Sequence, residues 1–202
     1  MPIFLRKKCS VLYLHVPKTG GSAIEQFFAR NEFRTEYCDT GGPHSFNRFR
    51  RCSPQHLHAE PITAALRPAR FDFVFMTVRN PLARIVSEYR MRLSGEGARP
   101  PALSEWLDQT FNRFAEDPYT GDNHIRPQSE FWLPNCEVYR QEDGYGPALV
   151  NRIEERLVTE LEHRDIGQVN LAKATDPDSD EIKAIEPRVR QFYRQDYLTF
   201  GY

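Results

Sequence analysis

Residues 11–22, with the sequence VLYLHVPKTGGS, decide the fold of this chain. They begin with an apolar run, VLYLHV, that is typical of a short buried β-strand. The run leads into the adjacent glycines Gly20 and Gly21, and apolar residues then recur at helical spacing from Ile24 onward. A strand, a glycine-rich turn and a helix in this order predict an α/β unit.

The turn at residues 17–22 has the chemistry of an anion-binding site. The first N–H groups of a helix have no partner within the helix, and the helix dipole is positive at that end. Lys18 adds a positive charge, and Thr19 and Ser22 add hydroxyl donors. In the P-loop of nucleotide-binding proteins the Lys follows the glycines, whereas Lys18 precedes them and no G-K-S or G-K-T occurs in the chain.

A second unit of the same kind lies further along the chain. Residues 71–78, FDFVFMTV, favour a strand because they are rich in aromatic and β-branched residues. Asn80 and Pro81 then suit the N-cap and first position of a helix, and the apolar spacing predicts that helix over residues 82–93.

The rest of the chain continues this alternation of strands and helices. Helical spacing recurs at residues 103–114 and 149–161, and in a last helix that contains Pro187. Residues 136–139 suit a short strand, and residues 118–134 read as irregular. The pattern predicts one α/β domain over residues 1–202, with three α/β/α layers and a central parallel sheet.

Charge and hydropathy restrict the partners of the protein. Residues 1–101 hold 16 Lys and Arg against 8 Asp and Glu, whereas the whole chain has a net charge of −1. This asymmetry favours a local anionic ligand over nucleic acid. No apolar run approaches the ~20 residues of a membrane helix, and no signal peptide is apparent, so a cytoplasmic protein is expected. The oligomeric state is left open.

Two segments closely resemble motifs of the sulfotransferases that use 3'-phosphoadenosine 5'-phosphosulfate (PAPS). Residues 15–22, HVPKTGGS, resemble the loop that binds the 5'-phosphosulfate, and residues 77–89, TVRNPLARIVSEY, resemble the 3'-phosphate motif. The resemblance implies the P-loop-like sulfotransferase fold and PAPS as the donor. The residues that it implies for PAPS binding are Lys18, Thr19, Gly20, Gly21, Ser22, Arg79 and Ser87.

Three further segments are similar to the carbohydrate sulfotransferases of the heparan and chondroitin sulfate type. They are SPQHLHA at residues 53–59, DNHIRPQ at residues 122–128, and the terminal residues 193–202. The similarity implies a glycan acceptor and a reaction without magnesium. The chain is short for that family, and Pro187 interrupts what is usually a continuous terminal helix.

The same resemblance implies roles for individual residues. Lys18 is expected to neutralise the leaving phosphate, and His56 to act as the general base, because histidine titrates near neutrality. His58 is the competing base, since an H-x-H pair on an extended segment points both rings the same way. The residues expected to contact the acceptor are His58, His124, Arg126 and Gln128.

A metal site is not expected from the sequence. The histidine pair His56 and His58 has no third ligand at suitable spacing, and the four cysteines form no C-x-x-C pair. Two other functions stay open at this point. A nucleotide-dependent kinase would bind ATP with magnesium, and a non-catalytic relative would bind a nucleotide or glycan without turnover.

Overall fold

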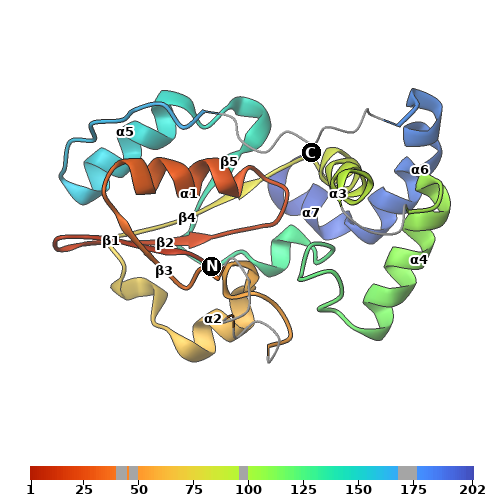
Figure 1. Ribbon diagram of the computed structural model, residues 1–202, viewed down its shortest axis with the longest axis horizontal. Helices are drawn as coiled ribbons and strands as arrows, with labels where there is room; N and C mark the ends of the chain where they lie inside the picture. Colours follow the sequence, from red (N-terminus) through yellow and green to blue (C-terminus); the bar gives the residue numbers. More distant parts are fainter. Residues whose placement is uncertain (40–44, 46–49, 96–99, 168–176) are drawn as a thin grey trace.

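The computed structural model in Figure 1 describes most of the chain, namely residues 1–39, 45, 50–95, 100–167 and 177–202. Within these residues five strands form one sheet in the order β3-β1-β2-β4-β5. The strands are β1 (Ile3–Arg6), β2 (Cys9–Leu14), β3 (Arg34–Glu36), β4 (Phe73–Val78) and β5 (Glu137–Arg140).

The centre of the sheet is parallel, as the sequence predicts. β4 runs parallel to β2 on one side and to β5 on the other. β1 pairs antiparallel with both β2 and β3, so the complete sheet is mixed. The predicted strands at residues 11–16, 71–78 and 136–139 correspond to β2, β4 and β5, whereas β1 and β3 were not predicted.

Alternating side chains of the central strands fill two separate cores. Tyr13 and Phe75 lie on the face covered by helices α1 (Gly21–Arg30) and α5 (Gly146–Leu157), seen above the sheet in Figure 1. Leu14 and Met76 lie on the opposite face. That face packs against Ile62 of helix α2 (Ala59–Ala65) and Phe200 at the end of α7 (Arg194–Phe200). The predicted α/β/α class is therefore confirmed.

A third core joins the helices at one end of the sheet. Helices α3 (Pro81–Ser94), α4 (Leu103–Glu116) and α6 (Ser179–Phe192) pack together on the right-hand side of Figure 1. Asn80 caps α3 as predicted, because its side chain accepts hydrogen bonds from the N–H groups of Leu82 and Ala83. The last long helix, α6, contains Pro187 as predicted and continues through it to Phe192, so the interruption expected at Pro187 is absent.

Three local predictions need correction. The helix predicted over residues 149–161 ends at Leu157, where Val158 adopts a left-handed conformation. Helix α2 was not predicted at all. The irregular segment at residues 118–134 contains one short 3-10 helix, Gln128–Glu130.

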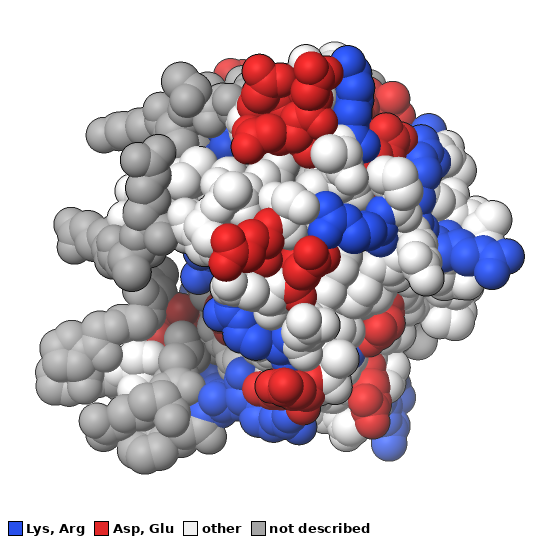
Figure 2. All heavy atoms as spheres, turned by 90° about the vertical axis from the view of Figure 1, so that its right-hand side faces the viewer, with Lys and Arg blue, Asp and Glu red and all other residues white. Residues whose placement is uncertain are grey.

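Charges of both signs cover the helical end of the molecule. Figure 2 views the right-hand side of Figure 1, and Lys and Arg are interspersed there with Asp and Glu. In the part of this face that the structure describes, no continuous basic patch of the kind that binds nucleic acid is present. None of the described helices is both long enough and apolar enough to cross a bilayer.

A buried carboxylate ties the C-terminal helix to the irregular segment. Asp196 of α7 is fully buried, and Oδ2 accepts a hydrogen bond from the backbone N–H of Gln128 at 2.8 Å. Oδ1 accepts bonds from the backbone N–H and the hydroxyl of Ser129, at 2.8 and 2.7 Å. The carboxylate thereby satisfies the first free N–H groups of the 3-10 helix Gln128–Glu130.

Replacing this carboxylate should destabilise the whole domain. Asp196→Ala leaves two buried N–H groups without an acceptor, and we expect the free energy of unfolding to fall by about 2–4 kcal/mol. Urea titration followed by circular dichroism measures the change. Asp180→Ala is the control, since the Asp180 side chain is 85% exposed and its loss should cost under about 1 kcal/mol. Equal costs for the two variants would contradict the role given to Asp196.

Candidate functional site

The carboxyl ends of β2 and β4 open onto one cavity of about 580 Å³. This is where ligands bind in open α/β sheets. Residues from both predicted motifs line it together with residues of the segment around His56. The predicted site residues that line it are Lys18, Gly20, Gly21, Ser22, His56, Arg79, Ser87 and His124.

The turn between β2 and α1 brings Lys18 to the cavity through an unusual backbone path. Lys18 has a φ of 69° and Gly20 a φ of 88°, so two residues of the turn adopt positive φ values. Burial lowers the pKa of Lys18 from 10.5, and the nearby carboxylate of Glu88 acts in the opposite direction. The turn thus brings a partly desolvated ammonium to the same cavity as Gly21 and Ser22, the first residues of α1.

Thr19 does not line the cavity. Its side chain is fully buried, and its hydroxyl donates to the carbonyl of Val16 at 2.8 Å. The same hydroxyl lies 2.8 Å from Oγ1 of Thr77 on β4. The side chain of Thr19 therefore joins the turn to the sheet, and the expected hydroxyl donor to an anion is Ser22 alone.

The two glycines of the turn are required by close neighbours. A Cβ on Gly21 would lie 1.9 Å from Nε2 of His15, and a Cβ on Gly20 would lie 2.4 Å from the hydroxyl of Tyr145. Cβ contacts below 3.0 Å are essentially never observed, so a side chain at either position would force a neighbouring group to move. The absence of side chains lets His15 and Tyr145 pack directly against the turn and support it.

Arg79 and Ser87 lie on the second strand-helix unit, which β4 and α3 form next to the turn between β2 and α1. Arg79 follows the last residue of β4, and its guanidinium Nη1 lies 3.5 Å from the carbonyl oxygen of Lys18. Ser87 lines the same cavity from α3. The parallel pairing of β2 and β4 places the two predicted anion motifs side by side.

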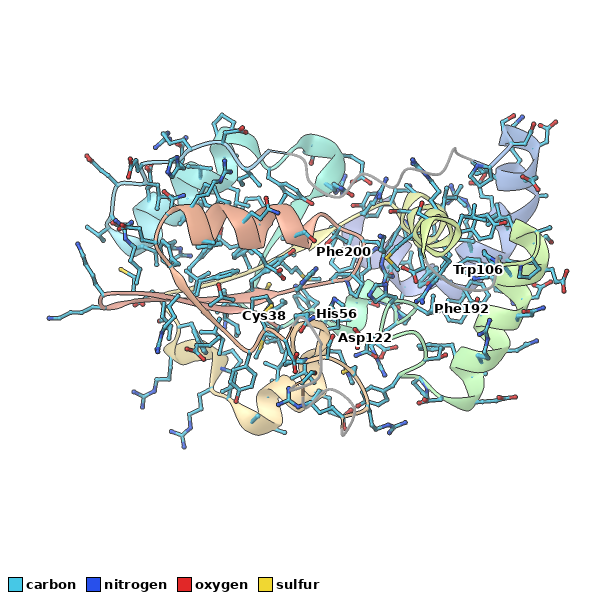
Figure 3. All side chains as sticks on the ribbon, in the orientation of Figure 1. Cys38, His56, Trp106, Asp122, Phe192 and Phe200 are labelled. Carbon is cyan, nitrogen blue, oxygen red and sulfur yellow. The ribbon has the colours of Figure 1, made fainter. Side chains whose placement is uncertain are left out.

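His56 is held by a carboxylate. Its Nδ1 donates to Oδ2 of Asp122 at 2.7 Å. Ser53 fixes the carboxylate, since its backbone N–H and its hydroxyl donate to Asp122 at 2.5 and 2.6 Å. Figure 3 shows His56 and Asp122 next to each other below the end of the sheet. With Nδ1 engaged, Nε2 is the ring nitrogen that remains to accept a proton.

Burial sets the protonation of this pair. It lowers the pKa of His56 to about 3, against the opposing effect of the hydrogen bond to Asp122. Burial raises the pKa of Asp122, but hydrogen bonds from His56 and Ser53 outweigh it and hold the pKa below its usual range. His56 is therefore neutral and Asp122 ionised near neutral pH.

A second imidazole-carboxylate pair stands beside the first. His124 Nδ1 lies 2.7 Å from Oε2 of Glu88, which is buried on α3. Burial raises the pKa of Glu88, but His124 and Arg92 outweigh it and bring the pKa to about 2. The rings of His56 and His124 meet edge to face, with centroids 4.8 Å apart.

A third histidine, His15, completes a row of rings along the cavity. Its centroid lies 5.1 Å from that of His56, and its Nδ1 lies 3.0 Å from Oε1 of Glu25. No functional role was predicted for His15, Asp122 or Glu88. All three stand inside the quoted motifs, so position within a motif was the one signal that could have found them.

His58 does not share the cavity with His56. The segment is not extended, because residues Pro54–His56 form a 3-10 helix, so the two rings do not point the same way. His58 is buried, with Nδ1 3.3 Å from the side-chain nitrogen of Asn123 and its ring edge against Phe131. The expectation of a common orientation is wrong.

Arg126 and Gln128 are also buried away from the cavity, contrary to the expectation of an exposed acceptor loop. Arg126 donates to Asn123 Oδ1 at 3.0 Å and to the carboxylate of Glu130. The side chain of Gln128 pairs with the backbone of Arg79, accepting from its N–H at 2.9 Å and donating to its carbonyl at 2.7 Å. Gln128 thereby fixes the backbone of Arg79 at the end of β4.

Comparison with known proteins gives one match. The family model described as "Sulfotransferase family" matches residues 1–202. The chain has no match among curated proteins or among solved structures.

The contact between Gly21 and His15 can be tested directly. Gly21→Ala should lower the free energy of unfolding by about 1–3 kcal/mol, because the new methyl group overlaps the imidazole ring. Urea titration measures the loss. Gly146→Ala is the control, since no atom lies within 4 Å of the Cβ it would gain.

The same contact predicts a rescue. Gly21→Ala should cost less in a His15→Ala background, where the ring that it overlaps is absent. An unchanged cost in that background would show that the strain comes from elsewhere.

Proposed function

The chain belongs to the sulfotransferase family, and from that premise we propose that it transfers the sulfuryl group of PAPS to a hydroxyl group of an acceptor. The acceptor hydroxyl loses its proton to the protein, and its oxygen forms a new S–O bond. The S–O bond to the 5'-phosphate breaks, and 3'-phosphoadenosine 5'-phosphate (PAP) leaves with the electron pair. Positioning and electrostatic stabilisation should dominate, as in phosphoryl transfer.

One observation carries the proposal: two separate anion-binding elements line the same cavity as a neutral histidine. Lys18 and the N–H groups at the start of α1 suit the 5'-phosphosulfate. Arg79 offers a guanidinium fork and Ser87 a hydroxyl, which together suit the 3'-phosphate. Gly20, Gly21 and Ser22 line the cavity beside Lys18, so the backbone of the turn is part of the proposed donor site.

We propose His56 as the general base, oriented by Asp122. The carboxylate holds the proton of His56 on Nδ1, so the lone pair of Nε2 is available for the acceptor proton. Asp122 also stabilises the imidazolium that forms. This is the division of roles found in carboxylate-histidine pairs of other enzymes. His58 is not a candidate for this role, since it lies outside the lining of the cavity.

Lys18 is the residue proposed to stabilise the leaving group. Charge develops on the 5'-phosphate as the S–O bond breaks, and a pre-positioned ammonium stabilises it without reorganising. Magnesium has no part in the proposal.

A glycan is the proposed acceptor class. The support is the likeness of residues 53–59 to carbohydrate sulfotransferases, together with polar groups such as Gln55 and His124 in the cavity. Arg126 was expected to contact the acceptor and could pair with an anionic sugar, but its guanidinium is engaged by Asn123 and Glu130. A neutral sugar hydroxyl is therefore the form of acceptor proposed. Screening sugars with sulfur-labelled PAPS tests the class.

Nucleotide selectivity tests the donor site. In calorimetric titrations without magnesium, PAP should bind more tightly than ADP, and Arg79→Ala should weaken PAP binding by about 10- to 100-fold. Binding of ADP should change little, because ADP has no 3'-phosphate.

The control is Arg113→Ala, which removes an exposed guanidinium of α4. It should leave both affinities unchanged. Equal binding of PAP and ADP, or tight binding of ATP only with magnesium, would favour the kinase reading instead.

Replacing His56 tests catalysis separately from binding. His56→Ala should lower the rate of sulfuryl transfer by about 10²- to 10⁴-fold, since it removes the proposed general base. PAP affinity should stay within about 2-fold of the wild type, since His56 contributes no charge to the donor site. Near-normal turnover in this variant would remove His56 from the mechanism, and absent turnover in the wild type with every acceptor would favour a non-catalytic binding protein.

A further inference from the structure

Three side chains near the cavity form a set that suits a metal ion. His56, Asp122 and His124 each offer one ligand atom, and these atoms all lie within 4.8 Å of one another. No other such set occurs among the residues that the structure describes. His56 and His124 also line the cavity.

The set has the composition of a transition-metal site. Two imidazoles and one carboxylate favour zinc and its first-row neighbours over magnesium and calcium, which prefer oxygen ligands. Oδ2 of Asp122 already lies 2.7 Å from Nδ1 of His56. Ligand atoms of a tetrahedral zinc ion lie about 3.4 Å apart, so the 4.8 Å limit on this set is close to the spacing that an ion requires.

The ligands are already oriented by neighbouring groups. His124 is held through Nδ1 by Glu88, and this leaves Nε2 for an ion. Asp122 is held by the backbone and hydroxyl of Ser53. A carboxylate behind a ligating imidazole is the usual outer shell of a zinc site, and it fixes the ring and raises its basicity.

We propose that Zn²⁺ binds His56 through Nδ1, Asp122 through its carboxylate and His124 through Nε2, and that the bound ion inhibits the protein. The ion takes the place of the proton that His56 shares with Asp122. The neutral ring then carries its one proton on Nε2, which no longer has a lone pair to accept the acceptor proton. The inhibition rests on the proposed role of His56, but the binding of the ion does not.

Zinc affinity is measured on the whole protein after treatment with a chelator. Calorimetry should show one Zn²⁺ per chain, and Asp122→Asn and His124→Gln should each weaken binding by about 10-fold or more. His163→Ala is the control, because it removes an exposed imidazole outside the cavity, and it should not change the affinity. Magnesium should not compete.

Substituting Co²⁺ gives a second readout of the same site. Its visible absorption bands should appear in the wild type and the His163→Ala variant, and should be lost in Asp122→Asn. Circular dichroism establishes that each variant is folded. Zinc binding that is absent, or that is equal in the wild type and the two ligand variants, would overturn the site.

The effect on His56 is measured without any assay of activity. Nitrogen NMR of the imidazole should show the proton on Nδ1 in the free protein and on Nε2 with zinc bound. A ring that keeps its Nδ1 proton when zinc binds would overturn the inhibition. Sulfuryl transfer that is lost with zinc and restored by chelator would support it, and transfer that continues with the site filled would refute it. Failure of the proposed function alone would leave zinc binding intact.

Discussion

The buried guanidinium of Arg84 connects the parts on which the site depends. Arg84 lies on α3 and is 2% exposed. Its Nε donates to the carbonyl of Pro17 at 3.0 Å, and its Nη2 donates to the carbonyl of His124 at 2.7 Å. The guanidinium also lies over the ring of Tyr193 at 5.7 Å. One side chain therefore holds the turn at residues 17–22, the helix after β4, and the segment of His124 in register.

Burying the charged guanidinium of Arg84 costs free energy, and its hydrogen bonds offset that cost. A buried charge is tolerated only where its hydrogen-bonding capacity is used, and backbone carbonyls supply acceptors here without a second buried charge at the guanidinium. One turn further along α3, Glu88 is buried as well and is compensated by His124 and Arg92. Helix α3 thus carries one buried cation, Arg84, and one buried anion, Glu88, and each contacts a segment that lines the cavity.

The parts of the fold that the sequence predicts are those that local patterns control. β2 with α1 and β4 with α3 each follow from an apolar run, a turn and a helical spacing within about twenty residues. The strands β1 and β3 are short, and β1 is placed by its pairing with both β2 and β3 rather than by its own composition. Helix α2 contains Pro61 and only one large apolar residue, Ile62, so its spacing gives no signal.

The residues of the site also divide into those placed by local sequence and those placed by long-range contacts. Lys18, Arg79 and Ser87 are placed by their own strand-helix units, and the sequence places them at one sheet edge. The orientations of Arg126 and Gln128 depend on partners brought close by folding, and Gln128 bonds to Arg79 across 49 residues. Local composition describes such a segment as an exposed loop, whereas the polar side chains are what allow its backbone to be buried.

The cavity combines cationic groups with imidazoles. The cationic groups Lys18 and Arg79 come from the turn and the end of β4. The imidazoles of His56 and His124 line the same cavity, each with an ionised carboxylate behind it. A carboxylate behind a base favours the protonated ring that forms when the base accepts a proton, and cations favour charge on a departing phosphate.

The position of one proton joins the proposed activity to the proposed inhibition. Asp122 keeps the His56 proton on Nδ1 because an ionised carboxylate accepts it at 2.7 Å. The same carboxylate and the same Nδ1 are what a zinc ion would take, and the proton would then move to Nε2. A ligand that displaces the proton between Nδ1 of His56 and the Asp122 carboxylate would therefore remove the lone pair of Nε2. The proposed PAPS site would stay unchanged. The contact between Nδ1 of His56 and the Asp122 carboxylate thus has two consequences. It makes His56 a suitable base, and, with His124 nearby, it also makes His56 a ligand for an inhibiting metal ion.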